Sequence, residues 1–213
     1  MTRFAILLGG DLTVTARLRA QIRGARVIAA DSGMMHAATL GLMPELWVGD
    51  FDSAGSELTM QYRDVPRESF PAEKDATDGA IAVAEAIRRG ATEIVLLGGL
   101  GGQTDHTAGL LGQSIEIARK GLACLLSSGI EEAWPVIPGS MEVALPPETR
   151  LSIIPFSDLE GLDLAGVKWP LLKRSVPLGS TLTLSNVALG PVRIAVSSGH
   201  GVAIAYPPLE FHV

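Results

Sequence analysis

The sequence predicts an α/β fold, with an N-terminal parallel-sheet (Rossmann-like) domain followed by a small antiparallel β-sandwich domain. From residue 4 to about 130, short apolar runs alternate with helix-like segments, which is the pattern of βαβ units in a sheet buried on both faces. After residue 137 a stretch rich in Pro and Gly follows, and beyond it only short β-rich runs remain. The 213 residues suffice for two domains, which we expect at 1–135 and 140–213.

The elements of the first domain follow from the apolar runs and from the helix-end signals. A helix over 11–24 has apolar residues near helical spacing and Asp11 as its expected N-cap. The two later helices each end in basic residues followed by glycine, as helices commonly do. The expected strands are 4–10, 25–31, 46–52, 93–99 and 122–128, and the expected helices are 11–24, 77–90 and 106–121.

The second domain is expected to begin after a linker over 137–150. Its runs are short and β-rich, and they carry no long helical period. The segment 197–201, "SSGHG", is a plausible hairpin turn between the last two strands. The expected strands are 150–156, 180–189, 192–198 and 202–206.

Composition and charge exclude several classes of protein. Hydrophobic residues make up 47% of the chain and charged residues 19%, which indicates a folded protein. The formal charge of -6 and the lack of long basic runs argue against nucleic-acid binding. No apolar run has the length of a membrane span. The single cysteine, Cys124, is expected to be a core thiol, and it fits a reducing, cytoplasmic location.

Asp50 and Asp52 close an apolar strand, where ligands of parallel sheets bind. If the chain stays extended, their side chains point the same way, so both could bind one hard cation while Phe51 faces the other side. One could instead cap a helix and the other be solvated. Asp31 lies just past another predicted strand, so the same edge of the sheet should carry it as well.

A second acidic pair, Asp75 and Asp78, stands three residues apart where a helix is expected to start. That spacing places both carboxylates on one face of the first turn. Asp75 could equally be only the N-cap, with Asp78 complementing the helix dipole. The two pairs together strengthen the interpretation of a cation site.

The third cluster is "LLGGLGGQTDH", residues 96–106, in which a strand leads into four glycines and then into a helix start. Such a turn exposes backbone N–H groups and admits phosphate close to the helix N-terminus. It matches neither the dinucleotide fingerprint nor a Walker A loop. His106 could be a capping or a core residue.

In the second domain, Trp169 in "GVKWPL" could be a core residue or an exposed ring that stacks on a flat, cationic heterocycle. Ser185 and Asn186 in "TLSNVAL" are the other candidate polar residues of this part of the chain.

Taken together, these motifs resemble those of the thiamine pyrophosphokinase family. The segments "ADSGMMHAATLGLMPELWVGDFDS", "FPAEKDATD", "LLGGLGGQTDH" and "LTLSN" occur in that family's order and approximate spacing, over nearly the whole chain. The resemblance implies transfer of a diphosphate group from ATP to the hydroxyl of thiamine, which gives thiamine diphosphate and AMP. It also implies a homodimer, whose thiamine sites lie where the two kinds of domain meet across subunits.

The resemblance assigns roles by position. It implies that ATP is the co-substrate and Mg²⁺ the cofactor, held by Asp50, Asp52 and Asp75, with Asp78 and Asp105 as further catalytic acids. The ATP site would be lined by Asp31, Thr77, Gly101, Gly102, Gln103 and His106, and the thiamine pocket by Trp169, Ser185 and Asn186.

The chain departs from the family pattern at several positions. It has "DSGMM" where Asp-Gly-Gly-Ala-Asn is common, Gln103 in place of arginine, Leu110 in place of asparagine and Val187 in place of an acid. Gln103 can donate hydrogen bonds but carries no charge, so phosphate contact there should be weaker. Two alternatives therefore stand beside the kinase: a related Mg²⁺-dependent phosphotransferase or phosphohydrolase, and a non-catalytic thiamine or nucleotide sensor.

Overall fold

The structure is a computed structural model that describes residues 1–51, 55–69 and 76–209. It divides into two compact units: unit 1 comprises Met1–Thr107 and Gly121–Gly129, and unit 2 comprises Ala108–Lys120 and Ile130–Val213. None of the helices in the described ranges has the length and hydrophobicity needed to cross a membrane.

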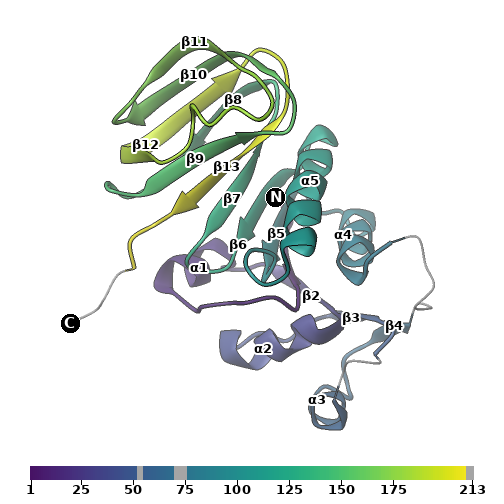
Figure 1. The fold of residues 1–213 in the computed structure, drawn as a ribbon. Coiled ribbons are helices and arrows are strands. Elements are labelled where there is room, and N and C mark those ends of the chain that lie inside the picture. The colour runs from purple at the N-terminus through teal and green to yellow at the C-terminus, as the bar shows by residue number, and fades with distance from the viewer. Residues whose placement is uncertain (52–54, 70–75, 210–213) are drawn as a thin grey trace. The chain divides into compact units, whose positions relative to one another are not determined.

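Unit 1 contains a parallel sheet in the order β6-β5-β1-β2-β3-β4 (Figure 1). The central strands are continuous apolar runs because both faces of the sheet are buried. The strands are β1 (Arg3–Leu7), β2 (Arg26–Ala30), β3 (Leu46–Gly49), β4 (Arg67–Ser69), β5 (Glu93–Leu97) and β6 (Ala123–Ser127). The prediction of a parallel α/β domain is confirmed.

Helices cover the sheet of unit 1. Alternate strand residues such as Ala5 and Leu7 share a core cluster with Leu18 of α1 and Met34 of η1, and α4 packs across β1, β2 and β3. The helices are α1 (Ala16–Gln21), η1 (Asp31–Met34, a 3₁₀ turn), α2 (Met35–Leu40), α3 (Ser56–Gln61), α4 (Asp78–Arg88) and α5 (Thr104–Arg119), of which only the first turn of α5 belongs to unit 1.

The first helix is shorter than predicted. Thr15 caps α1, since its hydroxyl accepts a hydrogen bond from Leu18 N at 3.1 Å, so the prediction of Asp11 as N-cap is wrong. Thr13 N donates to Ser128 O at 2.7 Å, which holds the preceding residues against the loop after β6 instead of in a helix.

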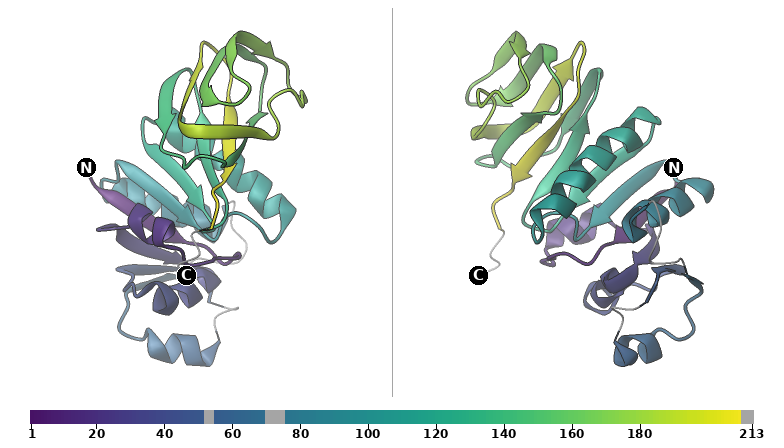
Figure 2. Two further views of the ribbon diagram at one scale, coloured as in Figure 1. Left: turned by 90° about the vertical axis from the view of Figure 1, so that its left-hand side faces the viewer. Right: turned by 45° about the vertical axis from the view of Figure 1, so that its right-hand side comes forward.

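Unit 2 contains antiparallel strands around a second core. Their order is β11-β10-β12-β9-β13-β7, with β8 also paired to β12. The long strand β12 pairs with β9 at its start and with β8 and β10 further along, so it belongs to both sheets of the unit. Figure 2 shows these strands curving. The strands are β7 (Glu132–Val136), β8 (Gly139–Val143), β9 (Arg150–Pro155), β10 (Leu159–Val167), β11 (Leu171–Val176), β12 (Asn186–Val196) and β13 (Gly201–Tyr206).

Three predictions in this half are wrong. The expected linker 137–150 contains β8. The expected strand 180–189 begins only at Asn186, because residues before it form turns and Ser185 has a φ of 58°. Residues 197–201 join β12 to β13, but these strands do not pair with each other: β13 lies between β7 and β9. Such pairings link segments far apart in sequence, and no local signal reports them.

Candidate active site

The strand order of unit 1 reverses at β1, with β2 to β4 on one side and β5 and β6 on the other. In open parallel sheets, ligands bind outside the carboxyl ends of the strands at such a point. The loops after β1, β2, β3 and β5 all end at this edge, since the strands are parallel.

The loops after β1 and β5 meet backbone to backbone. Leu8 N donates to Leu97 O at 2.8 Å, and Gly10 N donates to Gly98 O at 3.0 Å. A Cβ on Gly10 would lie 2.4 Å from Gly98 O, and one on Gly98 would lie 2.5 Å from Leu8 O, so only glycines fit. Gly9 and Gly10 were not predicted as site residues, although a Gly-Gly pair directly after a strand is a usable signal.

Asp31 and Asp50 follow the neighbouring strands β2 and β3. The two loops lie close together, because a Cβ on Gly49 would be 3.2 Å from Asp31 Cα. The buried Trp47 donates its indole N–H to Asp31 O at 2.8 Å, which holds Asp31 in its left-handed conformation with φ 45°. The structure thus brings these two predicted acids to one place on the sheet edge.

The predicted alternation beyond Asp50 is wrong, because the chain does not stay extended. Strand β3 ends at Gly49, and Phe51 has a φ of 63°. The Phe51 ring packs edge-on against Trp47, with 5.1 Å between centroids, so the backbone turns where the sequence predicted a strand. Asp52, the second member of the predicted pair, lies outside the described residues.

Asp78 is the first residue of α4, and Thr77 caps that helix by accepting a hydrogen bond from Ala80 N at 3.2 Å. A Cβ on Gly79 would lie 2.9 Å from a methyl carbon of Leu8, so the first turn of α4 lies against the end of β1. Asp75 lies outside the described residues, so its predicted pairing with Asp78 stays a prediction.

The glycine-rich loop after β5 leads into α5 with exposed backbone. Gly101 and Gly102 have φ values of 80° and 74° and are exposed. The side chain of Asp105 accepts a hydrogen bond from His106 N at 2.9 Å, and both residues are exposed, so His106 is not a core residue. Gln103 is likewise exposed.

Asp11 lies beside the glycine-rich loop, since a Cβ on Gly101 would be 3.7 Å from an Asp11 carboxylate oxygen. Within the described ranges, no three His, Cys, Asp or Glu side chains are placed to hold a metal ion. Two of the three predicted Mg²⁺ ligands lie outside those ranges, so that trio stays a prediction.

In unit 2, the three predicted thiamine-site residues differ in what they expose. Trp169 lies in the turn after β10 and is 53% exposed, so it is not a core residue. The Lys168 ammonium stands 4.7 Å from the centre of its ring. Ser185 is exposed, whereas Asn186 is buried.

Comparison with known proteins shows the family to which this chain belongs. The profile described as "Thiamin pyrophosphokinase, catalytic domain" matches residues 21–126, and "Thiamin pyrophosphokinase, vitamin B1 binding domain" matches residues 141–202. A thiamine pyrophosphokinase from Bacillus subtilis is 32% identical over 171 residues, which cover 75% of this chain and 76% of that protein. The chain belongs to the thiamine pyrophosphokinase family.

Solved structures of thiamine pyrophosphokinases share the fold over nearly the whole chain. The Bacillus subtilis structure has a TM-score of 0.86 at 25% identity and covers 98% of this chain and 100% of its own. The Geobacillus thermodenitrificans structure has a TM-score of 0.81 at 26% identity and covers 98% of each chain. The predicted enzyme class, a thiamine diphosphokinase, is confirmed, and these matches do not support the alternative functions.

Proposed function

We propose that this thiamine pyrophosphokinase binds ATP at the carboxyl edge of the parallel sheet in unit 1 and thiamine around Trp169 in unit 2. The proposed reaction moves a diphosphate group from ATP to the thiamine hydroxyl and releases AMP. The observation that carries the ATP site is the reversal of strand order at β1, with the exposed, left-handed glycines Gly101 and Gly102 at the same edge of the sheet.

The exposed loop suits phosphate. Gly101 and Gly102 lack side chains and have left-handed backbones, so their N–H groups can approach phosphate oxygens closely. The N-terminus of the long helix α5 follows directly and favours negative charge. Gln103 and His106 are exposed there and could donate further hydrogen bonds.

The acids suit a hard cation. Asp31 and Asp50 follow the neighbouring strands β2 and β3, and carboxylates together with phosphates are the ligands that Mg²⁺ prefers. We propose Asp50, Asp52 and Asp75 as the residues that hold Mg²⁺, with Asp78 and Asp105 as further acids of the site. Bound there, the ion would neutralise the charge of the triphosphate. The protein's own contribution would be to position the triphosphate for in-line attack by the hydroxyl.

We assign the functional boundaries 1–135 for the nucleotide and metal part and 140–213 for the thiamine part. Homodimer assembly and a cytoplasmic location stay predictions.

A product assay tests the proposal. Incubation with ATP, thiamine and Mg²⁺ should give thiamine diphosphate and AMP in equal amounts, and chelation of Mg²⁺ should abolish both. Asp50→Asn should lower kcat at least ~100-fold with the fold retained, whereas Asp64→Asn, at an exposed surface acid, should leave kcat unchanged. Release of ADP or inorganic phosphate alone, or normal turnover by Asp50→Asn, would refute the proposal.

A further inference from the structure

Asn186 is the only asparagine of the chain, and it lies at the start of β12 next to the turn that carries Trp169. We propose that Asn186 is a positioning residue, which fixes Trp169 for thiamine binding and does not contact thiamine itself. The proposal rests on the proposed function, since it takes Trp169 to be the residue that stacks on thiamine.

One side-chain amide bonds both polar backbone groups of Trp169. The Asn186 Oδ1 accepts a hydrogen bond from Trp169 N at 3.2 Å, and its Nδ2 donates to Trp169 O at 2.8 Å. The same Oδ1 also accepts from Val187 N at 2.9 Å. Only this orientation of the amide satisfies two N–H donors and one carbonyl at once.

These bonds leave little of Asn186 for a ligand. A carboxamide oxygen has two lone pairs, and both are used by backbone N–H groups. The residue is only 6% exposed, in contrast to the neighbouring Ser185, which is exposed. The two residues of the Ser-Asn pair thus differ: Ser185 is exposed, and Asn186 bonds the Trp169 backbone.

The amide extends the pairing of β10 and β12 beyond the end of β10. In the ladder Val167 stands opposite Ala188, and Lys168 N donates to Val187 O at 2.8 Å. At Trp169 the side chain of Asn186 replaces the backbone as partner, and its planar amide supplies the same donor and acceptor as a peptide group. The exposed indole is therefore carried on a turn whose backbone is fixed.

The segment before Asn186 is itself anchored to β9. Thr183 exchanges two bonds with Ile153: its hydroxyl donates to Ile153 O at 2.6 Å, and Ile153 N donates to Thr183 O at 3.0 Å. Ser185 N donates to Ser152 Oγ at 3.0 Å, and Ser185 holds a left-handed φ of 58°. This non-glycine left-handed residue comes directly before Asn186, whose side chain bonds the Trp169 backbone.

A double-mutant cycle tests the proposal with the full-length enzyme. Asn186→Asp keeps the shape and the two acceptor bonds but loses the donor to Trp169 O and sets two oxygens against each other. We expect it to raise the KM for thiamine about tenfold, with kcat and the KM for ATP within about twofold. In a Trp169→Ala background, the same substitution should change the KM for thiamine by less than about twofold.

The matched control is Thr183→Val, which removes the buried side-chain hydrogen bond of the same segment but keeps the backbone bond from Ile153 N to Thr183 O that anchors it. It should leave the KM for thiamine unchanged even if it lowers the melting temperature. If Asn186→Asp fails to fold, Asn186→Ser, whose side chain is too short to reach both groups, enters the same cycle.

Two outcomes separate the possible errors. A rise in KM of equal size with and without Trp169 would mean that Asn186 contacts thiamine directly, and would overturn this inference alone. If Trp169→Ala itself leaves the KM for thiamine unchanged, the thiamine site proposed above is wrong, and this inference fails with it.

Discussion

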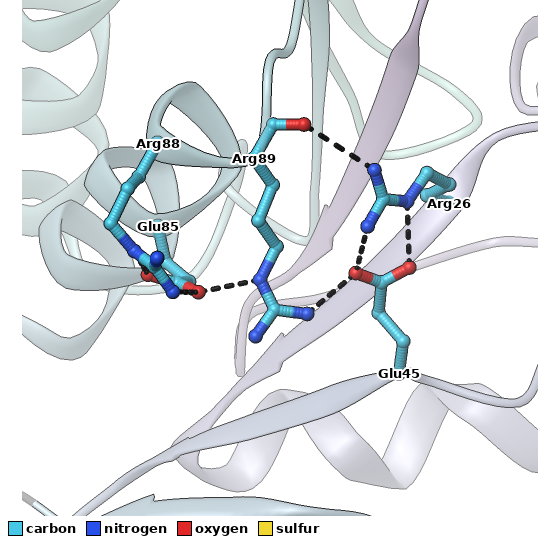
Figure 3. Close-up of polar contacts among 5 residues, drawn as sticks. All are labelled: Arg26, Glu45, Glu85, Arg88 and Arg89. Atoms are coloured by element: carbon cyan, nitrogen blue, oxygen red, sulfur yellow. Dashed lines mark hydrogen bonds and ion pairs between the residues drawn. The ribbon is translucent and has the colours of Figure 1, made fainter.

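Replacement of Glu85 by Gln should destabilise the enzyme at neutral pH without altering its kinetics. Figure 3 shows a chain of ion pairs in which Glu85 bonds Arg88 and Arg89, and Glu45 bonds Arg89 and Arg26. Arg26 begins β2 and Glu45 precedes β3, so the network lies at the amino ends of the strands, opposite the proposed ATP site. The Glu85 side chain is only 8% exposed.

The pKa of Glu85 sets the size of the effect. Hydrogen bonds from Arg88, reinforced by Arg89, lower the pKa of this carboxyl from 4.5 to about 2, against the opposing effect of its burial. A difference of that size between folded and unfolded chains corresponds to about 3 kcal/mol at pH 7. Because Arg88 is 69% exposed, solvent screens the pair, and we expect about 1.5 kcal/mol.

The lowered pKa of Glu85 also determines how its contribution to stability changes with pH. A carboxyl whose pKa is lowered on folding contributes its full stability above its unfolded pKa of 4.5, and loses it as the pH falls toward the folded value of about 2. Glu85→Gln should therefore lower the free energy of unfolding by about 1.5 kcal/mol at pH 7 and by less than about 0.7 kcal/mol at pH 3.

The assay is denaturant unfolding of wild type and Glu85→Gln at both pH values, followed by far-ultraviolet circular dichroism. Glu116→Gln is the control, because Glu116 and its partner Arg119 form an exposed pair, with side chains 60% and 55% exposed, and should contribute less than about 0.5 kcal/mol. The electrostatic explanation would be refuted if Glu85→Gln did not lower the free energy of unfolding at pH 7, or if it lowered it equally at pH 3.

Two further predictions concern the proposed sites. Gly33→Ala would place a Cβ 2.1 Å from Leu7 O, so it should cost about 3 kcal/mol or more of stability and reduce ATP binding. The control is Gly109→Ala, at a helical glycine with open space around it, which should stabilise the protein slightly. Thermal melting of both variants distinguishes the two outcomes. Lys168→Met should lower the KM for thiamine by about threefold, because the lysine ammonium competes with a cationic ligand for the Trp169 ring. A KM that rises instead would show that Lys168 aids binding.

The sequence predicted the apolar strands and the glycine-rich loop after β5 that form the carboxyl edge of the sheet. Asp31 and Asp50 were expected past strand ends, and the structure places them there, because a parallel sheet buried on both faces requires those apolar runs. The contact of the first loop with the Gly98 backbone was missed, since closeness between segments about 90 residues apart has no local signal. Asp52 and Asp75 lie outside the described residues, so their part in the site remains a prediction.

The sequence by itself determined the fold class and the family, because strand periodicity and motif order are local properties of the chain. Cys124 was expected in the core and is buried there, where desolvation raises the pKa of its thiol to about 12. Only the tertiary structure decided that the chain turns at Phe51, that β12 pairs with three other strands, and that Asn186 bonds the Trp169 backbone. Each of these depends on partners distant in sequence, whose approach is set by the packing of the whole unit.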